Sequence, residues 1–455
     1  MAEGRFDDLL ALDRDVARAA KALASWRAVL ADRPDEAAES DPFDGLRAVA
    51  ARSTWQRLGE LSPSAADEPL RAALRRWVLA FVQARVGGVD DVAWAREAAT
   101  ARGNYEGERQ RRVSWREAWR GVASGRSAAE ARLWLEAASD AAAPLAPVAR
   151  LRSARRAEVA RRMGLAHAWA PVASVDLGRL RASAARFLER TDDLSRAVWR
   201  ESLGAEAEVA AVLHAAVARD AGDGWPARLT PRWIDEQFGA GVRGLPLDLP
   251  ALPATLGAAS FARALALFGY AFRVASAQRT MPFAIANDPW FVGAHRLAFV
   301  FGALAADPEF HVRALGLGRR IAERQARVLA RTALLEARVG AARVFLGEAE
   351  GSPGDAFDEI GARLFPVGRA PLDRRLMGVW PAPRVDEPAR WIALLQAPGL
   401  RGALRDGFDV DWFRNPRAWT HLVSLGAGPA FEAVDESSLE PGADAVVRSF
   451  EYALG

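Results

Sequence analysis

The sequence has no cysteine, a single lysine, and few histidines, tyrosines and methionines. Because there is no thiol, disulfides, thiolate metal ligands and cysteine nucleophiles are all excluded. Apart from Lys21 the basic residues are arginines, and 61 basic against 58 acidic residues leave a formal net charge of +3. Arginine and alanine in such surplus are typical of a GC-rich genome. No basic cluster is interleaved with aromatic residues as a nucleic-acid binder requires, so we expect no nucleic-acid partner.

Long apolar runs and a secretory leader are also missing. Residues 1–15 (MAEGRFDDLLALDRD) are acidic and amphipathic, without the apolar region of a signal peptide. The longest apolar run, residues 297–306 (LAFVFGALAA), is too short to span a bilayer. These features predict a soluble, cytoplasmic protein without a membrane partner.

Helical periodicity, in contrast, is present almost everywhere. In most long segments the apolar residues recur at spacings of three and four, and the good helix formers alanine and arginine dominate. Such segments cover residues 7–31, 68–86, 177–203, 205–221 and 317–346. We interpret the arginine-rich stretch 108–120 as a solvated helix face, and only 243–252 suggests a short extended segment. The predicted fold class is all-α, mostly helical, with at most a small β element.

Proline and glycine gather in the breaks between these segments. One such break, residues 222–231 (GDGWPARLTP), lies near the middle of the chain, and 455 residues are enough for two or three domains. We therefore divide the sequence into an N-terminal helical region, 1–225, and a second helical region, 226–455.

The residues of hydrolytic and cofactor chemistry are missing from their usual patterns. A helical zinc site needs two histidines one turn apart, a third ligand, and a glutamate that activates water. The sequence has no HExxH, and no two of its histidines are four residues apart; they are His167, His214, His295, His311 and His421. GxSxG, P-loop and Rossmann patterns are also absent. Local motifs thus predict no metal, no cofactor and no catalytic residue.

Sixteen tryptophans are many for such a chain. We expect most of them to pack between helices, where their large rings bury much apolar area. Trp233 and Trp290 are candidates for lining a ligand cleft instead.

One predicted helix, residues 260–276 (SFARALALFGYAFRVAS), carries an unusual face. Ala266, Tyr270 and Arg273 are four and three residues apart, so they share one side of the helix. This is the spacing at which a helix offers two ligands to a metal, yet these side chains do not form a metal site.

The stretch 266–273 (ALFGYAFR) resembles the active helix of the thimet oligopeptidase/oligoendopeptidase F family of zinc metallopeptidases, whose members carry His-Glu-Phe-Gly-His-Ala-Leu-His. Phe268, Gly269 and Ala271 match this pattern. Ala266 stands at the first histidine, Leu267 at the catalytic glutamate and Tyr270 at the second histidine. The resemblance therefore marks 260–276 as a degenerate active-site helix.

Further segments extend the resemblance over about 240–455. Residues 294–310 resemble the next family helix, which carries the third ligand, a glutamate, and here His295 lies near that position. Residues 334–348 and 400–422 resemble two later family segments. No tyrosine lies between 271 and 451, where active members use tyrosines to stabilise the oxyanion. The resemblance implies a zincin-like oligopeptidase shell of helices around a deep channel.

These departures predict a pseudopeptidase, a family member that is not an enzyme and holds no zinc. Our first hypothesis is a non-catalytic subunit that forms a heterodimer with an active metallopeptidase paralogue and helps to bind a peptide. The alternatives are a stand-alone peptide or small-molecule binder, and a hydrolase with an unrecognised site. Candidate peptide-binding residues are Tyr270, Arg273, His295 and Arg296, with Arg279 also near the former site.

Overall fold

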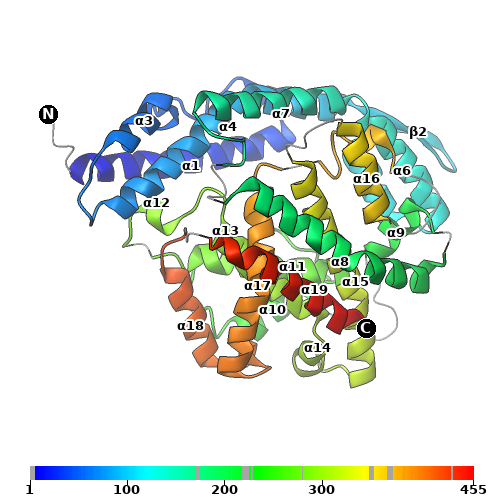
Figure 1. Cartoon of the computed structure of the whole chain (residues 1–455). Coiled ribbons are helices and arrows are strands. Elements are labelled where there is room, and N and C mark those ends of the chain that lie inside the picture. The colour runs from blue at the N-terminus through cyan, green and yellow to red at the C-terminus, as the bar shows by residue number, and fades with distance from the viewer. Residues whose placement is uncertain are drawn as a thin grey trace.

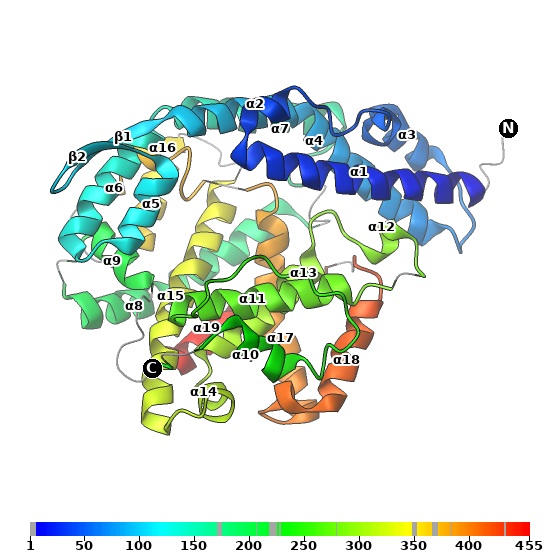
Figure 2. The ribbon, with the colours of Figure 1, turned by 180° about the vertical axis from the view of Figure 1, so that it is seen from behind.

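The computed structural model describes residues 6–170, 175–205, 207–217, 225–226, 229–278, 280–347, 353–365, 372–382, 384–431 and 434–455. Helices make up nearly all of its elements, which confirms the predicted all-α fold. They are arranged as an upper layer of N-terminal helices above a larger body, as both ribbon views show (Figures 1 and 2).

The upper layer has an apolar core of its own. Its helices are α1 (Phe6–Asp32), α2 (Pro34–Ala38), α3 (Arg52–Glu60), α4 (Glu68–Thr100) and α7 (Leu145–Arg162). Helix α4 buries Leu70, Leu74, Trp77 and Phe81, whose spacing places them on one face, as expected for an amphipathic helix. The short helix α12 (Phe283–Ala286), from the second half of the chain, completes this core.

The body contains the remaining helices and two further apolar cores. Its helices include α8 (Leu177–Leu203), α11 (Ala258–Ala275), α13 (Val292–Gly302), α15 (Arg319–Leu346), α17 (Glu387–Phe408), α18 (Pro416–Ala427) and α19 (Leu439–Leu454). The others are α5 (Trp115–Ser124), α6 (Ala128–Ala142), α9 (Val209–Ala216), α10 (Pro231–Phe238), α14 (Pro308–Leu315) and α16 (Pro353–Leu364). Short 3₁₀ helices cover Arg47–Ala50, Ala303–Ala306, Arg374–Leu376, Trp412–Arg414 and Glu436–Ser438. Helix α8 packs on α15 and α19, so the first half of the chain contributes to both layers.

The expected helix over 108–120 is wrong for its first part. The strands β1 (Arg102–Glu106) and β2 (Gln110–Ser114) form an antiparallel hairpin, and helix α5 starts only at Trp115. Residues 243–252, in which we expected an extended segment, form no strand. The prediction of at most a small β element is confirmed, but the element lies elsewhere in the chain.

Packing against α6 explains why a hairpin forms at this position. In β1 the buried Gly103 and Tyr105 alternate with exposed residues, which is the period of a strand with one buried face, and Val113 of β2 is buried opposite Gly103. The Tyr105 ring stacks on Trp134 of α6 with ring centroids 3.8 Å apart. A Cβ atom at Gly103 would lie only 1.8 Å from the carbonyl oxygen of Ala137, so glycine is what allows the strand to approach α6.

Periodicity alone locates these long helices, although not always their ends. The segment 177–203 has the bounds of α8, and 317–346 differs from α15 by two residues at its start, whereas α4 continues fourteen residues beyond the predicted 68–86. Among the described helices, none combines the length and the apolar character that crossing a membrane requires.

Candidate functional site

A cavity of about 2670 Å³ lies between the upper layer and the body. Helices α1, α4 and α7 contribute to one wall, and α11, α13, α15 and α17 to the other. The walls belong to different apolar cores, so core side chains do not fill the space between them. Small-molecule pockets usually measure roughly 300–1,000 Å³. This cavity can therefore admit a larger ligand.

Helices α11 and α13 cross closely beneath the cavity, and the residues of α11 that match the family pattern make this crossing. A Cβ atom at Gly269 would lie 2.4 Å from the carbonyl oxygen of Leu297, so only glycine permits the approach. Phe268 is 1% exposed and packs edge-on against Phe301, with ring centroids 5.2 Å apart. Phe268 and Gly269 therefore have a packing role.

The other face of α11 lines the cavity. Ala266, Leu267 and Tyr270 lie along the wall, and His295 of α13 joins them. The Tyr270 and His295 rings are in contact, with centroids 5.3 Å apart. The structure thus brings the four degenerate positions to the cavity surface. Trp290 also lines the cavity, as one of our alternatives for the tryptophans foresaw.

The remaining candidates lie elsewhere. Arg273 is 8% exposed, donates from Nη2 to the Gly428 carbonyl oxygen at 3.5 Å, and is not among the described residues that line the cavity. Arg296 is half-buried and is likewise absent from the described lining. Arg279 lies outside the described residues. Trp233 packs against Phe261 in a core of the body.

Burial controls the protonation of the two rings. Desolvation lowers the pKa of His295 to about 4, and the positive charge of Arg390 adds to this effect. Desolvation also raises the pKa of Tyr270, helped by Asp386 and opposed by Arg390. At pH 7 His295 is therefore a neutral imidazole and Tyr270 a neutral phenol, which can donate a hydrogen bond but cannot act as a base.

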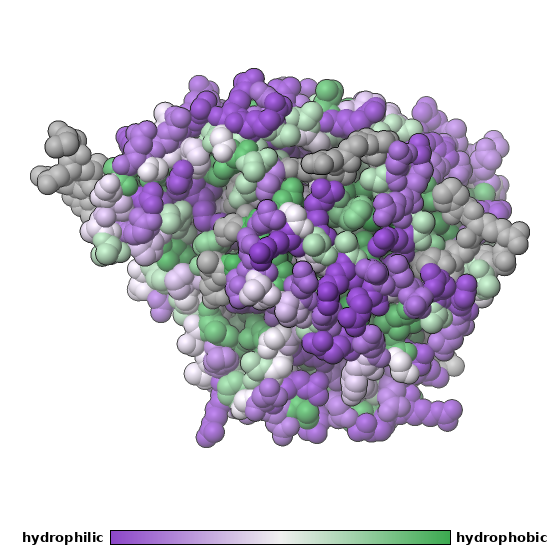
Figure 3. Space-filling view, in the orientation of Figure 1, coloured by the Kyte–Doolittle hydropathy of each residue, from purple (hydrophilic) through white to green (hydrophobic). Residues whose placement is uncertain are grey.

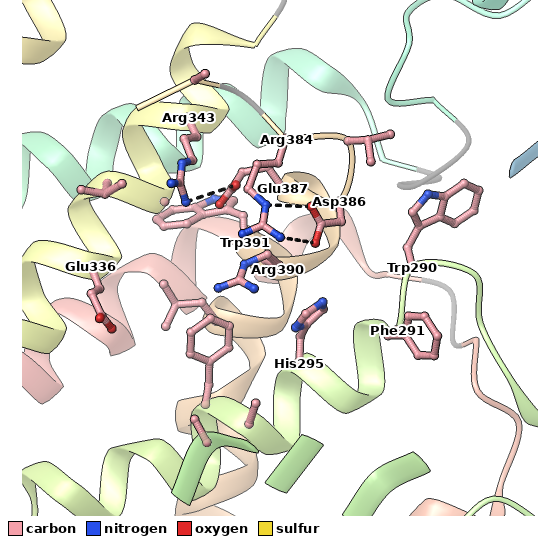
Figure 4. A pocket seen from close by; sticks show the side chains of 18 of the residues that line it. Trp290, Phe291, His295, Glu336, Arg343, Arg384, Asp386, Glu387, Arg390 and Trp391 are labelled. Carbon is pink, nitrogen blue, oxygen red and sulfur yellow. Dashed lines mark hydrogen bonds and ion pairs between the residues drawn. The ribbon is translucent and has the colours of Figure 1, made fainter. Parts of the chain in front are cut away.

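A group of charged residues surrounds the start of α17 (Figure 4). Arg384 binds Asp386 with both ends of its guanidinium, from Nε to Oδ1 at 3.1 Å and from Nη2 to Oδ2 at 3.2 Å. Arg343 of α15 lies 3.7 Å from Glu387, measured from Nη1 to Oε2. Arg390 is half-buried and lines the cavity. No residue in the described part of the chain forms an ion pair or a hydrogen bond with its guanidinium.

Two carboxyl groups near this cluster hold their protons more strongly than usual. Glu387 is 2% exposed, and desolvation raises its pKa against the opposing charge of Arg343. The side chain of Glu336 of α15 lies open to the cavity, and desolvation by the surrounding walls raises its pKa while Arg390 opposes the shift. Burial thus opposes the ionisation of both acids near Arg390.

Glu336, Glu387 and Arg390 could not be singled out from the sequence. They come from two helices far apart in the chain and fit no motif. The available signal was weak: several charged residues gather between positions 384 and 390.

The upper wall also carries more arginine than carboxylate. Asp91 of α4 forms ion pairs with two arginines of α7. Its Oδ1 lies 2.5 Å from Arg152 Nε and 3.4 Å from Arg156 Nη2. Desolvation and the neighbouring Arg152 lower the pKa of Arg156 to about 10. Desolvation lowers the pKa of Arg27 on α1, and both Asp91 and Asp386 counteract it. Because Asp386 belongs to the body, Arg27 acts across the cavity.

An ion pair links the two layers beside the cavity. Arg76 Nη2 of α4 lies 2.9 Å from Oδ1 of Asp288, a buried residue just before α13, and the Arg76 guanidinium stacks over Phe431. Nearby, Phe291 has a φ of +57°, a left-handed conformation that is uncommon for a bulky residue. Phe291 lines the cavity next to Tyr270, with ring centroids 5.8 Å apart. Strained backbone of this kind tends to gather at functional sites.

The residues at the family's zinc positions do not fit zinc. The ion takes three or four nitrogen, sulfur or oxygen ligands from a protein. Ala266 and Leu267 offer none, which leaves the Tyr270 phenol and the His295 imidazole. Across the described ranges, no three histidine, aspartate or glutamate side chains are grouped so as to hold a metal ion.

Solved structures with the same fold are peptidases. A protein assigned as an oligoendopeptidase F from Bacillus anthracis matches with a TM-score of 0.55 and 13% identity, over 90% of this chain and 84% of that one. A protein assigned as a peptidase from Chlamydophila abortus matches with a TM-score of 0.60 and 10% identity, over 98% of this chain and 90% of that one. PZ peptidase A, solved with an inhibitor, matches with a TM-score of 0.60 and 12% identity, over 99% of this chain and 98% of that one.

The chain has the fold of these peptidases. At 10–13% identity the likeness concerns the fold alone. No protein-family model matches the sequence, and no curated protein matches it either.

Proposed function

We propose that this protein binds peptides in the cavity between its layers and does not hydrolyse them. The observation that supports this most directly is the cavity face of α11. Ala266, Leu267 and Tyr270 line the wall where the resemblance places two zinc ligands and the catalytic base. Loss of a general base alone lowers a rate by roughly 10²-fold or more. Without the metal there is also no activated water for a base to serve.

The cavity itself supports ligand binding. Its volume of about 2670 Å³ remains although the catalytic side chains are replaced. Its walls combine apolar surface, including Trp290 and Phe291, with polar groups such as Tyr270, His295 and Arg390. Ligand sites of this kind use a few polar groups to orient a ligand that is mostly buried against apolar surface.

A role as the non-catalytic subunit of an active metallopeptidase is the second form of this proposal. A permanent subunit interface is large and apolar. The face seen in Figure 3 is mostly hydrophilic. Large exposed apolar side chains of the described chain are spread over several helices; they are Val86, Val89, Leu151, Val217, Val274, Leu425 and Tyr452. This distribution favours a stand-alone binder or a transient partner over an obligate one.

Native mass spectrometry of the protein purified gently from its own cells tests the proposal. We expect a zinc-free chain that retains peptide and does not cleave a mixed peptide library, with or without chelator. A second chain bearing HExxH in the same complex would support the subunit form. One zinc per chain together with chelator-sensitive cleavage would overturn the proposal, and chelator-insensitive cleavage would indicate a hydrolase with a different site.

A further inference from the structure

Arg390 differs from the other arginines around it. Arg384 is bound by Asp386 and Arg343 is close to Glu387, whereas no described residue pairs with the Arg390 guanidinium. Its side chain is half-buried at the cavity wall. A guanidinium taken partly out of water needs an acidic or hydrogen-bonding partner, and its planar fork matches a carboxylate with two parallel bonds.

Two neutral groups lie close enough to Arg390 for its charge to act on their protonation. They are the Tyr270 phenol and the His295 imidazole, both on the cavity wall. In the described part of the chain, no hydrogen-bond partner is found for the Tyr270 hydroxyl or for the His295 ring. A donating phenol, an imidazole N–H and a free guanidinium thus face the same space, as expected of an anion site.

The nearby carboxylates do not occupy this site. Glu387 is directed to Arg343, and neither Glu387 nor Glu336 lies within ion-pair distance of Arg390. Desolvation also raises the pKa of both acids, which opposes their ionisation near Arg390. Across the cavity, Arg152 and Arg156 share the single carboxylate of Asp91, so the opposite wall also favours an anion.

We propose that Arg390, Tyr270 and His295 form a carboxylate subsite of the cavity, which takes the C-terminal carboxylate or an acidic side chain of a bound peptide. This inference rests on the proposed function, and it names the ligand class that the cavity prefers. Arg390 supplies the charge and the bidentate fork, and Tyr270 supplies a further donor.

Isothermal titration calorimetry at pH 7 tests the subsite with three short peptides of one neutral sequence. The first has a free C-terminus, the second is amidated, and the third is amidated but contains one glutamate. A charge-assisted hydrogen bond is worth about 10- to 100-fold in affinity. We expect the free acid or the glutamate peptide to bind tighter than the neutral amide by that factor, and which of the two does so identifies the source of the carboxylate.

Variants then assign the preference to Arg390. Arg390→Gln should remove the advantage of the carboxylate peptide over the neutral amide, and far-UV circular dichroism shows whether the variant is folded. Arg390→Lys keeps the charge without the fork and should retain part of the advantage. Tyr270→Phe should weaken the carboxylate peptide several-fold. Arg232→Gln, at an exposed position on α10 outside the cavity lining, is the matched control and should change nothing.

Two results separate the subsite from the proposed function. If the wild type binds all three peptides equally, or Arg390→Gln weakens them alike, the subsite is wrong while peptide binding stands. If no peptide binds, the proposed function fails, and succinate alone then decides the subsite. A saturable rise in thermal stability with succinate that Arg390→Gln removes would support it, and the absence of such a rise would overturn it.

Discussion

The rings of Tyr270 and His295 lie next to each other at the α11–α13 crossing, with centroids 5.3 Å apart and planes inclined by 60°. The family resemblance places a zinc-binding histidine at the first position and a zinc-binding glutamate near the second. Two positions that, by this resemblance, would share a metal are therefore in contact here, although a phenol and an imidazole alone do not suit zinc.

Restoring the ligands should restore zinc binding. In the variant Ala266→His, Leu267→Glu, Tyr270→His, two imidazoles one turn apart would face the cavity beside His295. We expect about one zinc per chain in this variant and none in the wild type, as measured by metal analysis after dialysis. Adding His295→Ala should remove most of the affinity. Zinc in the wild type, or none in the triple variant, would contradict this reading of α11.

Gly269→Ala should destabilise the protein. The added methyl group would lie 2.4 Å from the backbone oxygen of Leu297, and a backbone atom cannot move aside cheaply. We expect a loss of about 1–3 kcal/mol in the free energy of unfolding, measured with urea. The control is Gly402→Ala in α17, where nothing lies within 4 Å of an added Cβ, so the helix should gain about 0.5–1 kcal/mol. Equal effects at both glycines would argue against the close crossing.

Acid should destabilise the protein through His311. This ring is 0% exposed, and desolvation lowers its pKa from 6.5 to about 4, against the hydrogen bond to the Ala305 carbonyl oxygen. Between pH 6.5 and about 4 the imidazole is protonated in the unfolded chain but stays neutral in the folded one. The contribution of His311 to the free energy of unfolding is therefore fully present above pH 6.5 and is lost as the pH falls towards 4. The expected slope is about 1.4 kcal/mol per pH unit.

Urea unfolding of the wild type and of His311→Gln at pH 7, 6 and 5 measures this contribution. The variant starts from a lower stability, because it loses packing, but its stability should depend less on pH. His295 shifts in the same direction, so some pH dependence should persist until it too is replaced. Parallel pH curves for wild type and variant would contradict a neutral buried His311.

Removing only one partner of the Arg76–Asp288 ion pair, which links the two layers, should lower the free energy of unfolding strongly. In Arg76→Met the carboxylate of Asp288, with a side chain 1% exposed, would be left buried without its cation. We expect a loss of about 3–5 kcal/mol in urea unfolding. The double variant Arg76→Met, Asp288→Asn should recover much of it. Arg232→Met breaks an exposed pair with Glu236 and should cost less than about 1 kcal/mol.

Helical periodicity predicted most of the fold because α8 and α15 carry their apolar residues at spacings that only a helix brings to one face. It missed the hairpin because 108–120 was judged by its arginine content. Ser114 and Glu117 were the better signal, since this Ser-x-x-Glu pair starts α5, with the Glu117 amide donating to Ser114 Oγ at 3.2 Å.

The candidate site divides in the same way. Tyr270 and His295 could be found from the sequence because each falls at a position of a short family pattern. Arg390 and Glu336 could not, since their neighbourhood depends on how α15 and α17 pack around the cavity. Arg273 was expected in the cavity beside Tyr270. It lies in the last turn of α11, and its guanidinium donates to the Gly428 carbonyl oxygen instead of joining the described cavity lining.

The two faces of helix α11 thus have different roles. Phe268 and Gly269 specify how the helix docks, while Ala266, Leu267 and Tyr270 line the cavity. We expect exchanges on the cavity face to disturb the crossing less than exchanges at Phe268 or Gly269. The protein is for this reason a ready scaffold for engineering, in which a designer could rewrite ligand preference on one side of a single helix and leave its architecture untouched.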